Sequence, residues 1–100
     1  METTEIRLLT IVAEEILRDR LIDEIRSAGA KGFTLTEVAG EGSRHRRVGD
    51  VLGGNIKLEV LASPTVADRL LSVLASDYFP QYAVIAYVTT VGVVRSERYA

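Results

Sequence analysis

Hydrophobic and polar residues alternate along this chain with two different periods, and the order of these periods predicts its elements. Residues 6–12 form a short apolar run rich in β-branched side chains, which is typical of a buried strand. From Glu14 to Arg26 the apolar residues recur at helical spacing, with charged residues opposite them. Gly29 stands where the C-terminus of a helix favours a left-handed residue, and residues 33–38 alternate as a strand. The first part of the chain is therefore predicted to be strand, helix and strand.

The same order returns after a polar segment. Residues 56–60 alternate between apolar and charged side chains. Ser63 followed by a proline is an N-cap with proline at the first helical position, and it predicts a helix whose apolar stripe extends to Tyr78. Pro80 is expected to end that helix, and residues 82–94 form a long β-rich run. The second half is also predicted to be strand, helix and strand.

The two halves align without a gap. Shifting the chain so that Leu9 meets Leu58 also superposes the Asp-Arg-Leu triplets at residues 19–21 and 68–70. A duplicated βαβ unit predicts an α+β fold, the ferredoxin-like plait (βαββαβ), as a single domain of residues 1–100. The right-handed crossover rule places both helices on one face of a four-stranded antiparallel sheet.

The predicted strands are apolar on both faces, although helices can cover only one. In the first strand Leu8 and Val12 alternate with Leu9 and Ile11, and the last strand alternates in the same way. The second face of a monomer would expose a large apolar patch, which soluble proteins rarely do. Either the C-terminal segment folds back over this face, or copies of the chain cover it. We favour self-association.

The segment between the halves, residues 40–55, combines five glycines with three arginines (Arg44, Arg46 and Arg47) and the only histidine, His45. Glycine leaves backbone N–H groups open to close approach, and the planar fork of arginine fits phosphate oxygens. The pattern predicts a loop that grips an anion, most simply a phosphorylated ligand. A solvated loop is the alternative for the arginines and the expectation for His45.

Composition narrows the class of protein. One hundred residues with 47% hydrophobic side chains and a net charge of -2 suit one folded domain, not a polybasic tail that binds nucleic acid. The chain has no cysteine, so a disulfide framework and a thiolate zinc site are excluded. It has one histidine, so a His-based metal centre is not expected. Nucleophile, base and orienting group are not available together. No apolar run reaches the roughly 18 residues of a membrane helix. We expect a cytoplasmic domain that is not an enzyme, holds no metal and binds no nucleic acid.

Residues 29–42, GAKGFTLTEVAGEG, resemble the second strand and loop entry of PII signalling proteins, whose pattern is G-x-T-x-T-E-V-x-G-x-G. The continuation SRHRR at residues 43–47 and the run NIKLE at residues 55–59 are similar to the PII-like branch typified by the bicarbonate-transport regulator SbtB. The resemblance implies a homotrimer with sheets facing inward and adenine nucleotides bound between subunits. It also implies a T-loop, residues 41–55, that changes shape with the ligand and touches a partner.

The same resemblance implies roles for individual residues. Thr34 would lie by the base, the loop glycines would let the backbone approach the nucleotide, and the serine and arginines would hold phosphate. The implied nucleotide-binding residues are Thr34, Gly40, Gly42, Ser43, Arg44, Arg47, Val84 and Ile85. The residues expected to face a partner are Arg46, Val48, Asp50, Val51 and Leu52.

Two departures from the PII pattern shape the expected ligand. Residues 79–83, FPQYA, replace a G-D-G-K stretch, and Glu41 stands where a lysine is common. Both changes remove cationic contacts to additional phosphates. We therefore expect AMP, ADP or cyclic AMP as the regulatory ligand in preference to ATP, with bicarbonate as a candidate second ligand and no further cofactor.

The resemblance implies a setting in inorganic-carbon (bicarbonate) metabolism. The partner would be a membrane bicarbonate transporter or an enzyme of carbon metabolism, and a transporter partner would bring the protein to the membrane surface. The alternative is a CutA-like ferredoxin-fold trimer that binds metal or a small metabolite without nucleotide.

Overall fold

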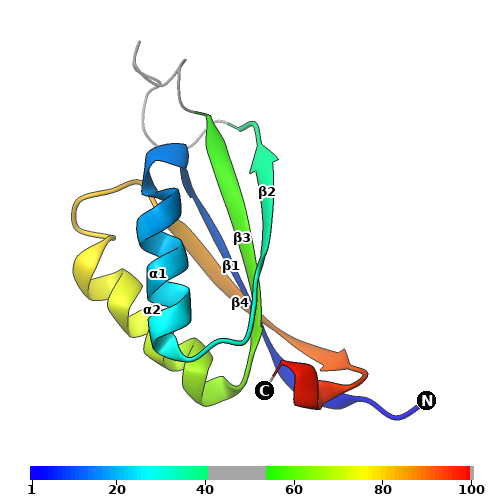
Figure 1. The fold of residues 1–100 in the computed structure, drawn as a ribbon. Helices are drawn as coiled ribbons and strands as arrows, with labels where there is room; N and C mark the ends of the chain where they lie inside the picture. The colour runs from blue at the N-terminus through cyan, green and yellow to red at the C-terminus, as the bar shows by residue number, and fades with distance from the viewer. Residues whose placement is uncertain (41–53, 100) are drawn as a thin grey trace.

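The computed structural model describes residues 1–40 and 54–99 and shows the predicted order of elements (Figure 1). The strands are β1 (Thr4–Glu14), β2 (Thr34–Val38), β3 (Asn55–Ala62) and β4 (Ile85–Val93), and the α-helices are α1 (Arg18–Ala28) and α2 (Pro64–Asp77). The 3-10 turn η1 (Glu15–Leu17) precedes α1, and the 3-10 turn η3 (Ser96–Arg98) follows β4.

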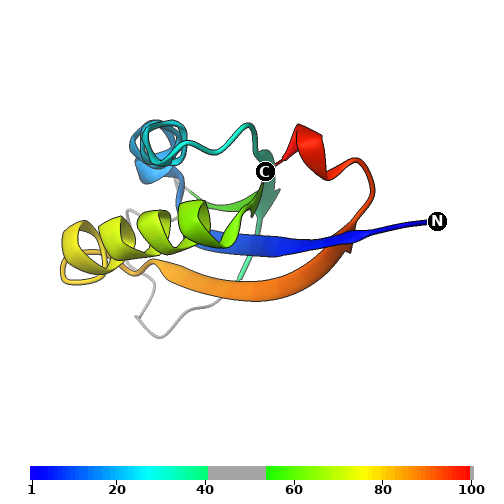
Figure 2. The ribbon, with the colours of Figure 1, turned by 90° about the horizontal axis from the view of Figure 1, so that it is seen from below.

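The four strands form one sheet in the order β2-β3-β1-β4, and every neighbouring pair is antiparallel. Both helices lie on the same side of this sheet (Figure 2). Within residues 1–40 and 54–99 no helix lies on the opposite side, here called the open face. The predicted α+β plait is confirmed. Among the described strands β2 and β4 are the edge strands, which matters for the site because each of them pairs with one other described strand.

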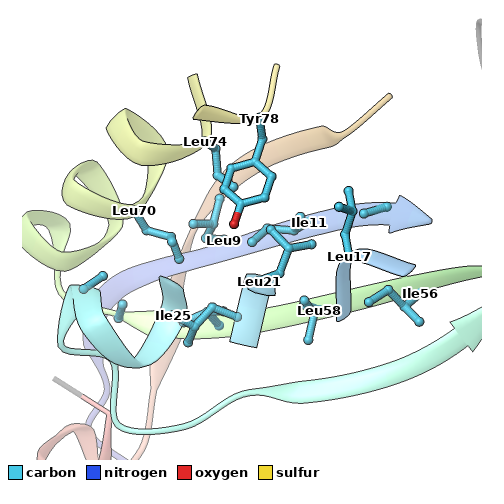
Figure 3. Close-up of a cluster of buried hydrophobic side chains, with 14 residues drawn as sticks. Leu9, Ile11, Leu17, Leu21, Ile25, Ile56, Leu58, Leu70, Leu74 and Tyr78 are labelled. Atoms are coloured by element: carbon cyan, nitrogen blue, oxygen red, sulfur yellow. The ribbon is translucent and has the colours of Figure 1, made fainter. Parts of the chain in front are cut away.

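The core lies between the helices and the covered face of the sheet. Its side chains come from alternate positions of β1 and β3 and from the apolar stripes of α1 and α2 (Figure 3). The largest fully buried members are Leu9, Ile11, Leu21, Ile25, Ile56, Leu58, Val60, Leu70, Leu74 and Tyr78. Burial of these side chains drives folding, since each fully buried large apolar side chain contributes about 1.5–3 kcal/mol.

The predicted helix ends are present. Gly29 adopts φ 99°, a left-handed conformation that favours glycine, and its N–H donates to the Arg26 carbonyl at 3.1 Å. At the start of α2, Ser63 Oγ accepts a hydrogen bond from the Val66 N–H at 3.3 Å. The two helices are also tied together, because Arg69 Nη1 donates to the Ala28 carbonyl at 2.7 Å.

The start of the first helix is later than its polar periodicity predicts. Glu14 remains in β1, where it pairs with Asn55, and α1 begins only at Arg18 after the η1 turn. Leu17 is nevertheless buried, because the 3-10 turn also directs it into the core. Asn55, predicted as the end of the loop, is a strand residue.

The segment between α2 and β4 is a turn, although its sequence is β-rich. The N–H groups of Tyr78 and Phe79 both donate to the Leu74 carbonyl, at 3.1 and 2.9 Å, and the Tyr82 N–H donates to the Tyr78 carbonyl at 2.9 Å. The proline after Phe79 disfavours helical geometry at that residue. The helix therefore ends at Asp77, and β4 starts at Ile85, three residues after the predicted start.

The described C-terminal segment does not cover the open face. The turn η3 lies beside the connection between α1 and β2, where Lys31 Nζ donates to the Glu97 carbonyl at 2.9 Å. On the open face Ile85 and Tyr87 keep 52% and 51% of their surface exposed. The sequence allows two ways of covering the open face, and in the described residues the C-terminal segment does not provide the cover.

Candidate functional site

The predicted loop leaves and re-enters the sheet at adjacent positions. Val38 at the end of β2 pairs with Asn55 at the start of β3. Gly54 precedes Asn55 with φ 70°, and its carbonyl accepts the Glu15 N–H at 3.1 Å. The ends of β1, β2 and β3 therefore converge at the base of the loop, at one end of the sheet (Figure 1).

An open hollow of about 320 Å³ lies at this base. It is lined by Glu15, Glu37, Val38, Gly54 and Asn55. The hollow carries two carboxylates and one amide, and Glu15 Oε1 also lies 3.4 Å from Arg18 Nε. Its described lining is acidic and repels phosphate, so the cationic groups of an anion site have to come from elsewhere.

Four of the eight predicted nucleotide-binding residues lie in the described part of the chain: Thr34, Gly40, Val84 and Ile85. The others, Gly42, Ser43, Arg44 and Arg47, lie outside the described residues, as do Glu41 and His45. The same holds for the predicted partner-facing residues Arg46, Val48, Asp50, Val51 and Leu52.

Thr34 and Ile85 share a face of the sheet but lie at opposite edges. Thr34 begins β2 and pairs with Glu59, whereas Ile85 begins β4 and pairs with Val12. The register places both side chains on the open face. Three strand spacings separate the two edges, which amounts to about 14 Å. One chain therefore does not bring the two side chains together.

Val84 and Gly40 occupy different environments. Val84 is half-buried and packs against the core on the covered side, so its side chain points away from the open face that Ile85 occupies. Gly40 follows β2 and is exposed. The structure thus separates two neighbours, Val84 and Ile85, that the resemblance had grouped together.

A cluster that the sequence did not predict lies beside the entrance to β4. Arg20 Nη1 donates to the Tyr82 hydroxyl at 2.9 Å, and its guanidinium lies 5.1 Å from the Tyr78 ring centroid and 5.4 Å from that of Tyr82. The Tyr78 hydroxyl donates to Glu24 Oε2 at 2.9 Å. We call these four residues the Arg20 cluster. The sequence feature that could have pointed to this cluster is the aligned pair of Asp-Arg-Leu triplets. The arginine of each triplet, Arg20 or Arg69, reaches the end of the other helix.

The protonation of the cluster follows from its surroundings. Burial of the Tyr78 ring, followed by its hydrogen bond to Glu24, raises the pKa of Tyr78 to about 12. The hydrogen bond to Tyr82 raises the pKa of Arg20, which is therefore a permanent cation. At neutral pH Tyr78 is a neutral donor that joins α2 to α1.

Comparison with known proteins identifies the family. The model of the family described as nitrogen regulatory protein P-II matches residues 6–98. The chain belongs to the nitrogen regulatory protein P-II family. This match covers both halves of the plait and the loop between them, and it favours the PII resemblance over the CutA-like alternative.

Solved structures resemble this PII-family chain along its whole length. A protein of Thermus thermophilus assigned as a PII-like signalling protein is 51% identical, with 100% of both chains covered and a TM-score of 0.86. CPII of Thiomonas intermedia, a PII-like protein bound to ADP, AMP and bicarbonate, is 19% identical, with 98% and 96% covered and a TM-score of 0.88. The ATP complex of GlnK from B. subtilis is 15% identical over 87% and 82% of the chains, with a TM-score of 0.63.

The described residues also bear on metal sites and membrane spans. Within residues 1–40 and 54–99, no group of three or more His, Cys, Asp or Glu side chains is placed to hold a metal ion. Over the same ranges, neither helix has the length and hydropathy needed to cross a membrane.

Proposed function

We propose that this PII-family protein is a sensor that binds an adenine nucleotide between subunits and signals through the loop of residues 41–55. The observation that carries the proposal is the placement of Thr34 and Ile85. They share the open face but lie at opposite edges of the sheet, so a site that uses both has to include two chains.

The proposed assembly is a homotrimer in which the open faces are turned inward. Ile85 and Tyr87 are half exposed on this face, and Leu8 and Val12 beside them are only partly buried. Covering these side chains with a second copy removes apolar surface from water, which favours association. The same contact brings the β2 edge of one subunit toward the β4 edge of its neighbour.

The proposed ligand is a nucleotide with one or two phosphates: AMP, ADP or cyclic AMP. Ser43, Arg44 and Arg47 would hold the phosphate, while Gly40 and Gly42 would allow the backbone to approach. CPII, which shares the fold, has been solved with ADP and AMP, and with bicarbonate. Among the described residues, those that line the hollow at the base of the loop include no cation that could bind a third phosphate.

The proposed partner is a bicarbonate transporter or an enzyme of carbon metabolism, in keeping with the SbtB-like run at residues 43–47. Arg46, Val48, Asp50, Val51 and Leu52 would form the contact. Bicarbonate as a second ligand is proposed on the same grounds.

Calorimetry with AMP, ADP, ATP and cyclic AMP tests the function directly. We expect AMP, ADP or cyclic AMP to bind with up to one ligand per chain, and ATP to bind more weakly. A titration of bicarbonate into the ADP-saturated protein tests the second ligand. Absence of heat with all four nucleotides would overturn the proposal.

A further inference from the structure

Side chains of α1 bind the turn that leads into β4. Within the turn, the Gln81 and Tyr82 N–H groups both donate to the Tyr78 carbonyl, at 3.0 and 2.9 Å. These bonds close the turn on itself and do not attach it to the sheet. In the described part of the chain, the strand that follows pairs with β1 alone, beginning at Ile85 opposite Val12. The position of the β4 entrance therefore depends on what fixes the turn from outside.

Two side chains of α1 provide this attachment. Arg20 and Glu24 are four residues apart and share a face of the helix, and Tyr78 and Tyr82 are four residues apart in the turn. Glu24 accepts the Tyr78 hydroxyl, and Arg20 donates to the Tyr82 hydroxyl, each at 2.9 Å. In the described residues Arg20 and Glu24 therefore bind tyrosines rather than each other.

The two tyrosines differ in how firmly they are already fixed. Tyr78 is 1% exposed and packs in the core, where it reaches from the end of α2 toward Leu21 (Figure 3). Tyr82 is half-buried and lies at the edge of the core. Its hydroxyl is fixed by Arg20, whose guanidinium lies over both rings. Loss of Arg20 would leave the core intact and release Tyr82.

We propose that Arg20 is a positioning residue of the nucleotide site, because it fixes Tyr82 and thereby the chain at Val84 and Ile85, where the proposed site meets β4. This inference rests on the proposed function. Arg20 does not touch the ligand; it acts through the turn.

Arg69 supports this assignment through the internal repeat. It occupies the position in α2 that Arg20 occupies in α1, and it donates to the Ala28 carbonyl at the end of α1. Each arginine thus binds at or just after the C-terminal end of the opposite helix. Arg69 binds the last residue of α1, before the connection that leads to β2, and Arg20 binds the connection that leads to β4.

Hydrogen exchange of residues 79–86 and calorimetry with ADP test the proposal on the full-length protein. In Arg20→Ala we expect exchange in this segment to accelerate about tenfold, because a hydrogen bond from a charged donor is lost. The affinity for ADP should fall several-fold, and the midpoint of thermal unfolding should change little. Arg20→Lys keeps the charge without the planar fork and should restore part of both effects.

Arg26→Ala is the matched control, because Arg26 is an exposed arginine in the last turn of the same helix. It should change neither measurement. The combination of Arg20→Ala with Tyr82→Phe should accelerate exchange by less than the product of the single effects, since both changes break one hydrogen bond.

The outcomes separate this inference from the proposed function. Unchanged exchange and unchanged ADP affinity in Arg20→Ala would overturn the role of Arg20, as would equal effects in Arg26→Ala. Failure of the unmodified protein to bind any adenine nucleotide would overturn the proposed function and with it the role of Arg20 in the site. In that case, faster exchange in Arg20→Ala would show that Arg20 fixes the turn and has no role in a nucleotide site.

Discussion

Tyr78 joins the two helices through a hydroxyl that stays protonated in the folded protein. Its pKa is raised from 10.0 to about 12 by burial and by the bond to Glu24. The unfolded chain loses this proton near pH 10, whereas the folded chain keeps it to about pH 12. The resulting stabilisation is fully present below about pH 10 and is lost as the pH rises toward about 12. Urea denaturation at about pH 9 and about pH 11 measures this loss.

Tyr78→Phe is the control for this pH dependence. Every other ionisable side chain is common to both proteins, so the difference between the two proteins isolates Tyr78. The variant should lose less stability between the two pH values than the unmodified protein. Equal losses would contradict the assignment of the raised pKa to Tyr78.

The loop arginines give a second prediction at the residue scale. If Arg44 and Arg47 hold phosphate, alanine at either position removes a charge-assisted contact of roughly 1.5–3 kcal/mol, which is about one to two decades in affinity for AMP. Arg44→Lys should recover only part of the loss, since lysine lacks the fork. Calorimetry with AMP measures the change.

Two controls accompany the arginine variants. Arg46→Ala should cost much less, because Arg46 is assigned to the partner, and adenosine should bind all variants alike, because it carries no phosphate. A double alanine variant at Arg44 and Arg47 that bound AMP as tightly as the parent would refute the anion grip.

The cap of α2 gives a prediction at the scale of an element. Ser63→Ala removes the acceptor of the Val66 N–H and should destabilise the protein by about 1 kcal/mol. Ser72→Ala, at an exposed position inside the same helix, should be neutral or slightly stabilising, because alanine has the higher helix propensity. Urea denaturation of both variants checks the pair, and similar losses would mean that Ser63 does not act as a cap.

Helices and strands could be predicted where one side of the element is buried, because one-sided burial makes the apolar residues recur at a fixed spacing. Leu21 and Ile25 on α1, and Leu70 and Leu74 on α2, are all buried as the helical stripes require. The ends of the elements were harder to predict where backbone hydrogen bonds determine them. The residues before β4 look like strand because they are apolar, yet the Tyr82 N–H closes a turn instead.

Hydrophobic periodicity could not predict the contacts between the two halves of the chain. Arg20 and Glu24 have the spacing of a helical ion pair, but each finds a tyrosine from the segment after α2. The spacing along one helix says nothing about what a second helix presents to it. Alignment of the repeat marks Arg20 and Arg69 as equivalent, and only the packed helices reveal that each crosses to the other half.

At the scale of the whole molecule, the site depends on the order of the strands. The resemblance to PII proteins placed Thr34 and Ile85 in one site, and the sheet order puts them at opposite edges. A sequence read one residue at a time lacks this information, because register and strand order arise from contacts between distant segments. The resemblance supplied the expectation of a site between subunits, and the geometry gives the physical reason why a site that used both residues would need two chains.

The open face yields the last prediction, which concerns assembly. If copies of the chain cover this face, light scattering should give a mass near three times the 11.0 kDa of the chain. Tyr87→Asp places a charge on the proposed contact, where burying it without a partner is costly, and should shift the protein toward monomer. Ile16→Asp is the control, since Ile16 is 81% exposed but lies on η1 and not on the sheet. A Tyr87→Asp protein that kept the trimer mass would show that the subunits meet elsewhere, and the ligand site would then need residues other than Thr34 and Ile85.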